Sequence, residues 1–241
     1  MLSVDVTLSL AQTIKRDMEV VTNNIANAQT AGFKGFATVL SESRWHPTPK
    51  QDYSFVQDLA TVRDTSLGAF KQTGDPFHLY INGQGYFAVQ TPQGTRYTRS
   101  GVFTLDNLNQ IVTAQGYPVM DTSNSPIVLP EGVFNISIGK DGTITDGEDN
   151  IGTVGRFSIP AGANLTDEAG SLINTDMPAV LDEEIPVLQH GYEASNVNTV
   201  VETTKLMSLL RAYQQAQSYI EAQSKLQSQM AQQLIKIAPA A

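Results

Sequence analysis

A glycine-rich segment is the first candidate for ligand chemistry in this chain. Residues 83–88 read Gly-Gln-Gly-Tyr-Phe-Ala and match the G-x-G-x-x-A form of a dinucleotide-binding turn. Such a turn requires a strand before it and a helix after it, because the helix N-terminus binds the pyrophosphate. Here residues typical of a strand follow, at 86–89. We therefore interpret Asn82-Gly83 as the turn of a type I′ hairpin and predict no cofactor.

Possible metal ligands are densest at residues 141–149, which read Asp-Gly-Thr-Ile-Thr-Asp-Gly-Glu-Asp. This segment lacks the regular ladder of oxygen ligands of an EF-hand loop. The histidines His46, His78 and His190 are far apart and show no H-x-x-x-H spacing that would bind a metal. We interpret 141–149 as solvated β-turns and predict no metal site.

Catalytic patterns are also missing from the sequence. There is no G-x-S-x-G nucleophile elbow and no cysteine. Asp182, Glu183 and Glu184 are neighbours in sequence, and neighbouring side chains do not converge on one site, so we interpret them as a solvated turn. The sequence leaves open carboxylate pairs that only folding would bring together. We predict a protein that is not an enzyme and that has no catalytic residues.

The charge of the chain is unevenly distributed. The 241 residues carry a formal net charge of −9, but residues 36–194 alone hold eight basic and 19 acidic side chains. An acidic centre repels nucleic acid and anionic lipid, so we expect neither as a partner. No run of 18 apolar residues is present, which argues against membrane insertion. The first residues lack a basic stretch before an apolar one, so we expect no cleaved signal peptide.

Helix-breaking residues are confined to the centre of the chain. All 18 glycines lie between Gly32 and Gly191, and ten of the 11 prolines lie between Pro47 and Pro186. The sequence therefore predicts a helix at each end, from about residue 3 to 28 and from about residue 199 onward. Residues 199–202 fit a capping box, and Asn196 or Asn198 are alternative caps.

Both terminal segments carry apolar residues at alternating steps of three and four, a period of 3.5 that is typical of helices that pair in coiled coils. An ordinary amphipathic helix on a globular core is the alternative interpretation. Gln223 and Gln227 interrupt the second series and either set register or face water. The predicted interface comprises Ala11, Ile14, Met18, Val21, Ile25, Leu206, Leu209, Tyr213, Ile220, Met230 and Leu234.

The centre has the pattern of an antiparallel β domain, with short strands separated by tight turns. We predict an α+β fold in which paired, coiled-coil-like terminal helices carry an inserted β-sandwich or barrel-like domain. The predicted domains are a helical core of residues 1–33 plus 192–241, an extended linker at 34–75 and a β-rich domain at 76–191. Burial of the two apolar series is too small to offset the entropy of ordering both ends, so we expect them to order only against neighbouring subunits.

Several segments resemble bacterial flagellar rod and hook proteins. Residues 20–28, followed by Gly-Phe-Lys at 32–34, are similar to the N-terminal signature of that family. Residues 82–87, 96–101 and 115–119 resemble its β body, and residues 195–198 with 211–213 resemble its C-terminal helix. These segments occur in the order of the family and cover nearly the whole chain. The motif residues are Asn23, Asn24, Asn27, Gly32, Phe33, Asn196 and Asn198.

The resemblance implies a structural role without chemistry. Length and the short linker look most like the proximal-rod members, and such a subunit would assemble with other proximal- and distal-rod proteins. The result would be a helical, homo- and hetero-oligomeric drive shaft in the periplasmic space that transmits torque and encloses the export channel. Export through the flagellar type III apparatus, without a cleaved signal, is implied as well.

Two other functions stay open at the level of sequence. One is a distal-rod paralogue of the same family. The other is a coiled-coil oligomer that displays a β domain for ligand binding.

Overall fold

The computed structural model describes residues 2–48, 51–132, 136–147, 149–168 and 171–237. The chain divides into two compact units. Unit 1 combines residues 1–26, 35–64 and 197–241, and unit 2 combines residues 27–34 and 65–196. The backbone therefore passes from one unit to the other four times.

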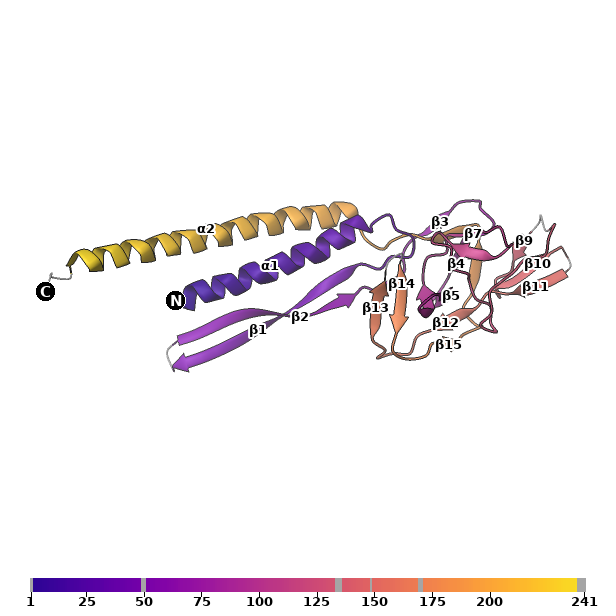
Figure 1. The fold of residues 1–241 in the computed structure, drawn as a ribbon, viewed down its shortest axis with the longest axis horizontal. Helices are drawn as coiled ribbons and strands as arrows, with labels where there is room; N and C mark the ends of the chain where they lie inside the picture. Colours follow the sequence, from indigo (N-terminus) through magenta and orange to yellow (C-terminus); the bar gives the residue numbers. More distant parts are fainter. Residues whose placement is uncertain (1, 49–50, 133–135, 148, 169–170, 238–241) are drawn as a thin grey trace. The chain divides into compact units, whose positions relative to one another are not determined.

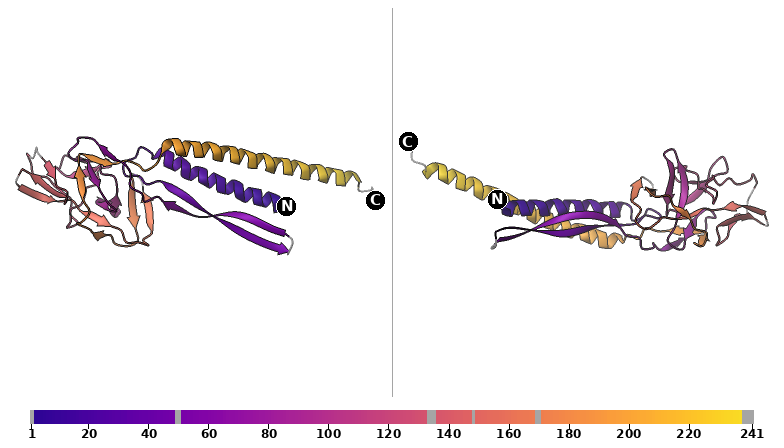
Figure 2. Two further views of the ribbon diagram at one scale, coloured as in Figure 1. Left: turned by 180° about the vertical axis from the view of Figure 1, so that it is seen from behind. Right: turned by 90° about the horizontal axis from the view of Figure 1, so that it is seen from below.

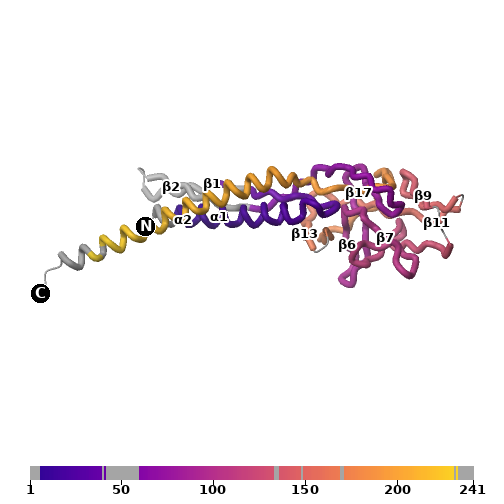
Figure 3. The backbone as a smooth tube through the Cα atoms, turned by 90° about the horizontal axis from the view of Figure 1, so that it is seen from above, coloured from indigo at the N-terminus to yellow at the C-terminus, as the bar shows by residue number. Residues whose placement is uncertain are grey.

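Unit 1 is built on two long helices, α1 (Leu2–Ala26) and α2 (Thr199–Ile237). The two helices pack against each other along α1, and α2 continues past the beginning of α1 (Figures 1 and 3). The predicted pairing of terminal helices is confirmed. Both helices form because their sequences contain neither glycine nor proline.

A long antiparallel hairpin completes unit 1. Its strands are β1 (Phe36–Thr48) and β2 (Gln51–Arg63), and both contact α1 on a side that α2 does not cover (Figure 2). The hairpin occupies most of the range 34–75, for which the sequence predicts an extended linker. The strands escape detection because they do not show the sustained alternation of apolar and polar residues that indicates a half-buried strand.

Unit 2 consists of short antiparallel strands in several small sheets. The largest sheet has six strands in the order β13-β14-β6-β5-β12-β15, and a three-stranded sheet has the order β11-β10-β9. The pairs β16-β4, β17-β3 and β7-β8 form three further two-stranded sheets. The strands are β3 (Phe70–Gln72), β4 (Leu79–Ile81), β5 (Tyr86–Thr91), β6 (Gly94–Thr98), β7 (Phe103–Leu105), β8 (Ile111–Thr113), β9 (Ile136–Ile138), β10 (Thr143–Asp146), β11 (Asp149–Thr153), β12 (Arg156–Ser158), β13 (Leu165–Glu168), β14 (Leu172–Thr175), β15 (Val180–Leu181), β16 (Val187–Gln189) and β17 (Gly191–Glu193).

The main apolar core of unit 2 draws residues from the six-stranded and three-stranded sheets and from the pairs β16-β4 and β7-β8. The rings of Phe87 and Phe103 meet edge to face at its centre, with ring centroids 5.1 Å apart, and both are fully buried. Buried aliphatic side chains from seven strands and the loops between them complete this core. The α+β class with an inserted antiparallel β region is therefore confirmed.

The predicted Asn82-Gly83 hairpin is wrong, although the predicted strand after it is present as β5. The strand β4 before this segment pairs with β16, and β5 pairs with β6 and β12. Long-range bonds hold the segment between two sheets: Asn82 N donates to Pro186 O at 2.9 Å, and Arg99 Nη1 donates to Gly83 O at 2.7 Å. Tight turns do join other neighbouring strands, β5 to β6 and β7 to β8.

Candidate assembly interface and charge cluster

The predicted interface residues of α1 lie on its face toward α2 and the hairpin. Ala11, Ile14 and Val21 are buried, and Met18 and Ile25 are half-buried. This face has the spacing that sequence predicts for a helix that pairs with another helix. Whether these residues also take part in contacts between subunits stays a prediction.

The predicted interface residues of α2 separate into two groups. Leu206, Leu209, Tyr213 and Ile220 are half-buried and lie along the part of α2 that runs beside α1. Met230 is 63% exposed, and Leu234 lies outside the residues whose side chains the structure describes. The structure thus assigns an intramolecular contact to the first group and none to Met230.

The second half of α2 extends beyond α1 and carries exposed apolar residues (Figure 1). With 39 residues against 25, α2 is 14 residues longer than α1, which is about 21 Å of helix at 1.5 Å per residue. Tyr219, Leu226 and Met230 are 44%, 51% and 63% exposed. Of the two glutamines in the series, Gln223 is half-buried and Gln227 is exposed. An exposed apolar series on a long helix is a surface that a partner can cover.

The asparagines of the family motif mostly act on backbone groups. Asn24 is 3% exposed; its Nδ2 donates to Phe36 O at 2.8 Å, and its Oδ1 accepts from Phe36 N at 2.8 Å. Asn24 Nδ2 also donates to Glu202 Oε2 of α2 at 3.2 Å. One side chain therefore joins α1, the base of the hairpin and the first turn of α2. Asn23 is exposed.

Asn198 is the N-cap of α2, one of the two alternatives that the sequence offers. Its Oδ1 accepts from Val200 N at 3.0 Å and Val201 N at 3.3 Å. In unit 2, Asn196 Nδ2 donates to Ser66 Oγ at 3.1 Å. Asn27 stabilises the turn after α1, because its backbone oxygen accepts from Thr30 N at 3.0 Å.

Gly32 packs where no side chain fits. Its φ is +69°, and a Cβ at this position would lie 2.3 Å from Ser100 N. Gly32 N donates to Glu193 O at 2.8 Å, so the close approach is part of the hydrogen-bonded structure. The next residue, Phe33, is half-buried, and its carbonyl accepts from Asn196 N at 3.4 Å. The motif residues at 32–33 and 196 therefore meet in unit 2.

A buried charge cluster lies beside this glycine. The Glu193 side chain is 1% exposed; Oε1 accepts from Lys34 Nζ and from Gly68 N at 2.7 Å, and Oε2 accepts from Arg99 Nε at 2.8 Å and from Arg99 Nη2. Lys34 Nζ also donates to Ser66 O at 2.6 Å. Two cations share one carboxylate, and their remaining donors reach backbone oxygens, which makes burial of the charges tolerable.

Sequence reasoning missed this cluster. Lys34, Arg99 and Glu193 are separated by 65 and 94 positions, since 99 − 34 is 65 and 193 − 99 is 94. No short-range pattern links residues so far apart. The only available signal was their position next to motif segments, at 32–34, 96–101 and 195–198.

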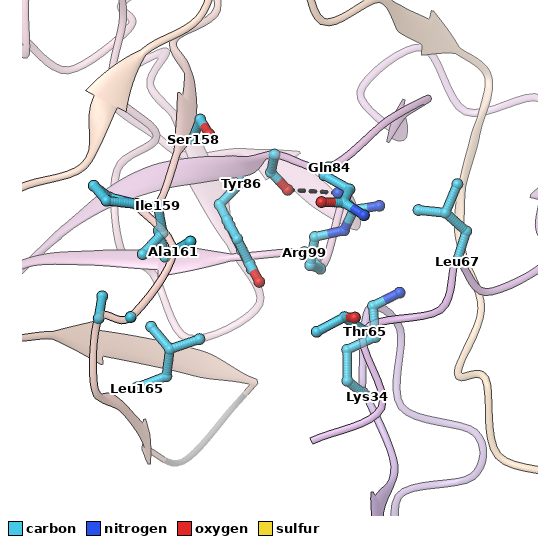
Figure 4. Close-up of a pocket in the computed structure, with 14 residues that line it drawn as sticks. Lys34, Thr65, Leu67, Gln84, Tyr86, Arg99, Ser158, Ile159, Ala161 and Leu165 are labelled. Carbon is cyan, nitrogen blue, oxygen red and sulfur yellow. Dashed lines mark hydrogen bonds between the residues drawn. The ribbon is translucent and has the colours of Figure 1, made fainter. Parts of the chain in front are cut away.

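A cavity of about 250 Å³ adjoins the cluster (Figure 4). Arg99 and Lys34 line one part of it, and Ile159 and Leu165 line another. Tyr86 lies between them, with the Arg99 guanidinium 5.9 Å from its ring centroid. Both cations already bond Glu193, and the lining offers no activated nucleophile, so we assign no reaction to the cavity.

Within the segment 141–149, the described residues 141–147 and 149 lie in turns and in the paired strands β10 and β11. Asp141 Oδ2 accepts from Thr143 Oγ1 at 2.8 Å, and this bond, with a second from Thr143 N, lowers the pKa of the Asp141 carboxyl. Among the described residues, no three His, Asp or Glu side chains gather as metal ligands. His78 Nδ1 bonds Thr73 Oγ1 at 2.7 Å, and His46 lies outside the described side chains.

Residues 182–184 form the predicted turn. Asp182 Oδ1 accepts from Glu184 N at 3.1 Å, and the backbone oxygen of Glu183 accepts from Arg156 Nη2 at 3.1 Å. Arg156 is 1% exposed, and burial lowers the pKa of its guanidinium, although the nearby carboxylates of Glu183 and Asp141 favour the charge. Of the three acids of this turn, Glu183 and Asp182 therefore act on the charge of Arg156.

Three protein-family models match the chain. The "Flagella basal body rod protein" model matches residues 11–34, the "Flagellar hook protein FlgE/F/G D1 domain" model matches residues 80–146, and the "Flagellar basal body rod FlgEFG protein C-terminal" model matches residues 189–234. The three matches contain all of the segments that carry the sequence resemblance. No helix in the described part of the chain is both long and apolar enough to cross a membrane.

Full-length relatives agree with these matches. The chain is 33% identical to the flagellar basal-body rod protein FlgF of Caulobacter vibrioides over 95% of its length and 96% of the relative's. It is 30% identical to FlgF of Mesorhizobium japonicum over 88% of its own length and 89% of the relative's. It is 32% identical to the rod protein FlgG of Caulobacter vibrioides over 88% of its own length and 94% of the relative's. With this similarity along nearly the whole chain, and with the motif residues meeting in the fold, the protein belongs to the flagellar basal-body rod family, whose members are structural proteins and not enzymes.

Proposed function

We propose that this chain is a structural subunit of the proximal rod. It assembles with other proximal- and distal-rod proteins into the axial shaft that transmits torque and encloses the export channel. The observation that carries this proposal is the exposed apolar surface on the second half of α2, with Leu226 and Met230 more than half exposed. A contiguous exposed apolar surface is typical of a site where another protein binds.

The Glu193 cluster supports a mechanical role. It bonds Lys34, the last residue before the chain passes into unit 1, and Gly68, which follows the return from unit 1. Glu193 itself lies shortly before the last passage, at 196–197. A buried, charged bond network at the points where the chain leaves unit 2 resists separation of these segments under load.

The export route is part of the same proposal. The named relatives are basal-body rod proteins, and a rod subunit must leave the cytoplasm to reach its place. The flagellar type III apparatus, acting without a cleaved signal peptide, is the route that the family resemblance implies.

Negative charge on the second half of α2 tests the proposal. In the native bacterium lacking its own copy of the gene, the double variant Leu226→Asp, Met230→Asp should be absent from purified basal bodies and should leave cells non-motile, because buried carboxylates oppose assembly. The control Ser228→Asp, Gln232→Asp adds the same charges on the opposite side of the same turns and should restore motility. Incorporation of the first variant would contradict the assembly role of this surface, and absence of the wild-type chain from basal bodies would contradict the function.

A distal-rod function is the second candidate, because the chain also matches FlgG of Caulobacter vibrioides at 32% identity. Electron microscopy of basal bodies that carry a tag on this chain separates the two. Label at the cell-proximal part of the rod supports the first function, and label near the hook supports the second.

A further inference from the structure

The hairpin of unit 1 carries an exposed aliphatic face. Ala37 lies directly opposite Val62, and Val39 lies directly opposite Ala60. Residues directly opposite in an antiparallel pair point to the same side of the sheet. Both alanines are exposed, and Val39 and Val62 are 41% and 50% exposed. We call these four residues the hairpin face.

The other side of the same strands packs on α1. Thr38 alternates with Ala37 and Val39, and its Oγ1 donates to Asp17 Oδ1 of α1. Phe36 bonds Asn24 through its backbone and is half-buried. Because successive residues of a strand point to opposite sides, the hairpin face is directed away from α1.

The second half of α2 offers a matching surface. Tyr219, Leu226 and Met230 follow one another at steps of seven and four, so they lie along one side of the helix. Successive residues of an α-helix are rotated by about 100°, so the charged residues Glu221 and Lys225 lie away from this side. Their charges are opposite and sum to zero. We call Tyr219, Leu226 and Met230 the α2 stripe.

One copy cannot bring its own two surfaces together. Asn24 bonds both Phe36 and Glu202, which fixes the base of the hairpin beside the first turn of α2. Leu226 lies 24 residues beyond Glu202, or about 36 Å along a rigid helix. The stripe is therefore available only to a different molecule.

We propose that the α2 stripe of one copy docks on the hairpin face of a second copy. Two apolar, uncharged surfaces at opposite ends of the same unit make a heterologous, head-to-tail contact, and repetition of such a contact builds an open assembly. This proposal rests on the proposed rod function and names the partner of its exposed helix.

Engineered cysteines test the contact directly, because the chain has no cysteine of its own. Val62→Cys and Leu226→Cys are made as separate variants and expressed together in the native bacterium in place of the wild-type chain. Mild oxidation of purified basal bodies should produce a heterodimer that neither variant gives alone. In the matched control, Val62→Cys is combined with Lys225→Cys. Lys225 directly precedes Leu226 but points away from the α2 stripe, so the yield of heterodimer should fall several-fold.

The outcomes separate this inference from the function on which it rests. A heterodimer that depends on Leu226→Cys supports the contact. Incorporation of both variants without a heterodimer, equal yields from the Leu226→Cys and Lys225→Cys pairs, or a cross-link from Val62→Cys to another rod protein would each overturn it and leave the rod function intact. Failure of the wild-type chain to appear in basal bodies would overturn the function itself.

Discussion

Glu193 shows how a single side chain can hold distant segments together. Its carboxylate is buried and bonds Lys34, Arg99 and the amide of Gly68. Removing the charge leaves two buried cations without compensation. The energetic effect should therefore be far larger than that of an ion pair on the surface.

The variant Glu193→Gln should lower the free energy of unfolding by about 3–5 kcal/mol, the range measured when one partner of a buried ion pair is removed. Urea denaturation followed by circular dichroism measures the change. The exposed Glu184→Gln is the control and should shift stability by less than about 0.5 kcal/mol. Equal stability of Glu193→Gln and wild type would show that the cluster does not stabilise the fold.

Gly32→Ala should destabilise the protein more than Gly147→Ala. Both glycines have positive φ, +69° and +64°, so both variants bear the cost of a left-handed alanine, about 1–2 kcal/mol. Only Gly32 is also crowded, because its added Cβ would lie 2.3 Å from Ser100 N while Gly147 faces open space. A comparison of the two melting temperatures isolates the steric part. Equal losses would indicate that the backbone around Ser100 relaxes freely.

Asp176 should make part of the fold sensitive to acid. Its carboxylate accepts from Asn164 Nδ2 at 2.7 Å and from Asn164 N at 2.8 Å, and these bonds lower its pKa below the ordinary 3.8. A group with a lowered folded pKa stabilises the protein fully above its unfolded pKa and loses this effect as pH falls through the folded value. NMR titration of the Asn164 amide should show a midpoint below pH 3.8, and Asp176→Asn should abolish it. A midpoint above pH 3.8 would contradict the assignment.

Among the elements, the terminal helices were the most predictable and the hairpin the least. Glycine and proline avoid both ends of the chain, so helix existence followed from local chemistry alone. Strands β1 and β2 depend on contacts with α1, such as those of Asn24 and Asp17, which no local pattern encodes. The prediction of a hairpin turn at Asn82-Gly83 was wrong for the same reason. Hydrogen bonds to Arg99 and Pro186 outweigh the local preference of Asn-Gly for a hairpin turn.

The candidate site shows the same difference between local contacts and contacts that are distant in sequence. Asn24, Gly32 and Asn198 were predicted as motif residues from the family resemblance. Asn198 has the local role of a helix cap, whereas Asn24 bonds Phe36 and Glu202 and Gly32 packs against Ser100. The cluster of Lys34, Arg99 and Glu193 exists only after strands far apart in sequence have come together. No local pattern in the sequence therefore links its three members.

The amides of α1 and α2 should become better protected from hydrogen exchange on assembly. Without neighbours, the helix pair buries few apolar side chains relative to the entropy of ordering it, so we expect amides of residues 5–28 and 205–235 to exchange rapidly in a dilute monomer. In purified basal bodies the same amides should exchange at least about tenfold more slowly, a difference of about 1.4 kcal/mol in opening free energy. Hydrogen exchange with mass spectrometry measures both states. Strong protection in the dilute monomer would show that the ends are already stable alone.

At the scale of the whole molecule, charge and apolar surface are separated. Residues 36–194 hold eight basic and 19 acidic side chains, whereas residues 195–241 hold four basic and two acidic ones. Copies that approach one another therefore meet attraction between apolar helices and repulsion between acidic centres. Salt screens the repulsion and leaves apolar contacts in place, so its effect on assembly reveals which force limits association.

We expect self-association of the purified chain to strengthen as sodium chloride rises from about 50 mM to about 500 mM, because the Debye length falls to a few ångströms and the acidic centres no longer repel one another. Sedimentation velocity at fixed protein concentration measures the shift toward larger species. In the triple variant Glu131→Gln, Asp149→Asn, Glu184→Gln, which removes three exposed acids from the centre, association at low salt should already be stronger and the salt dependence smaller. Association that weakens as salt is added would mean that ion pairs between copies, and not their apolar helices, hold the assembly together.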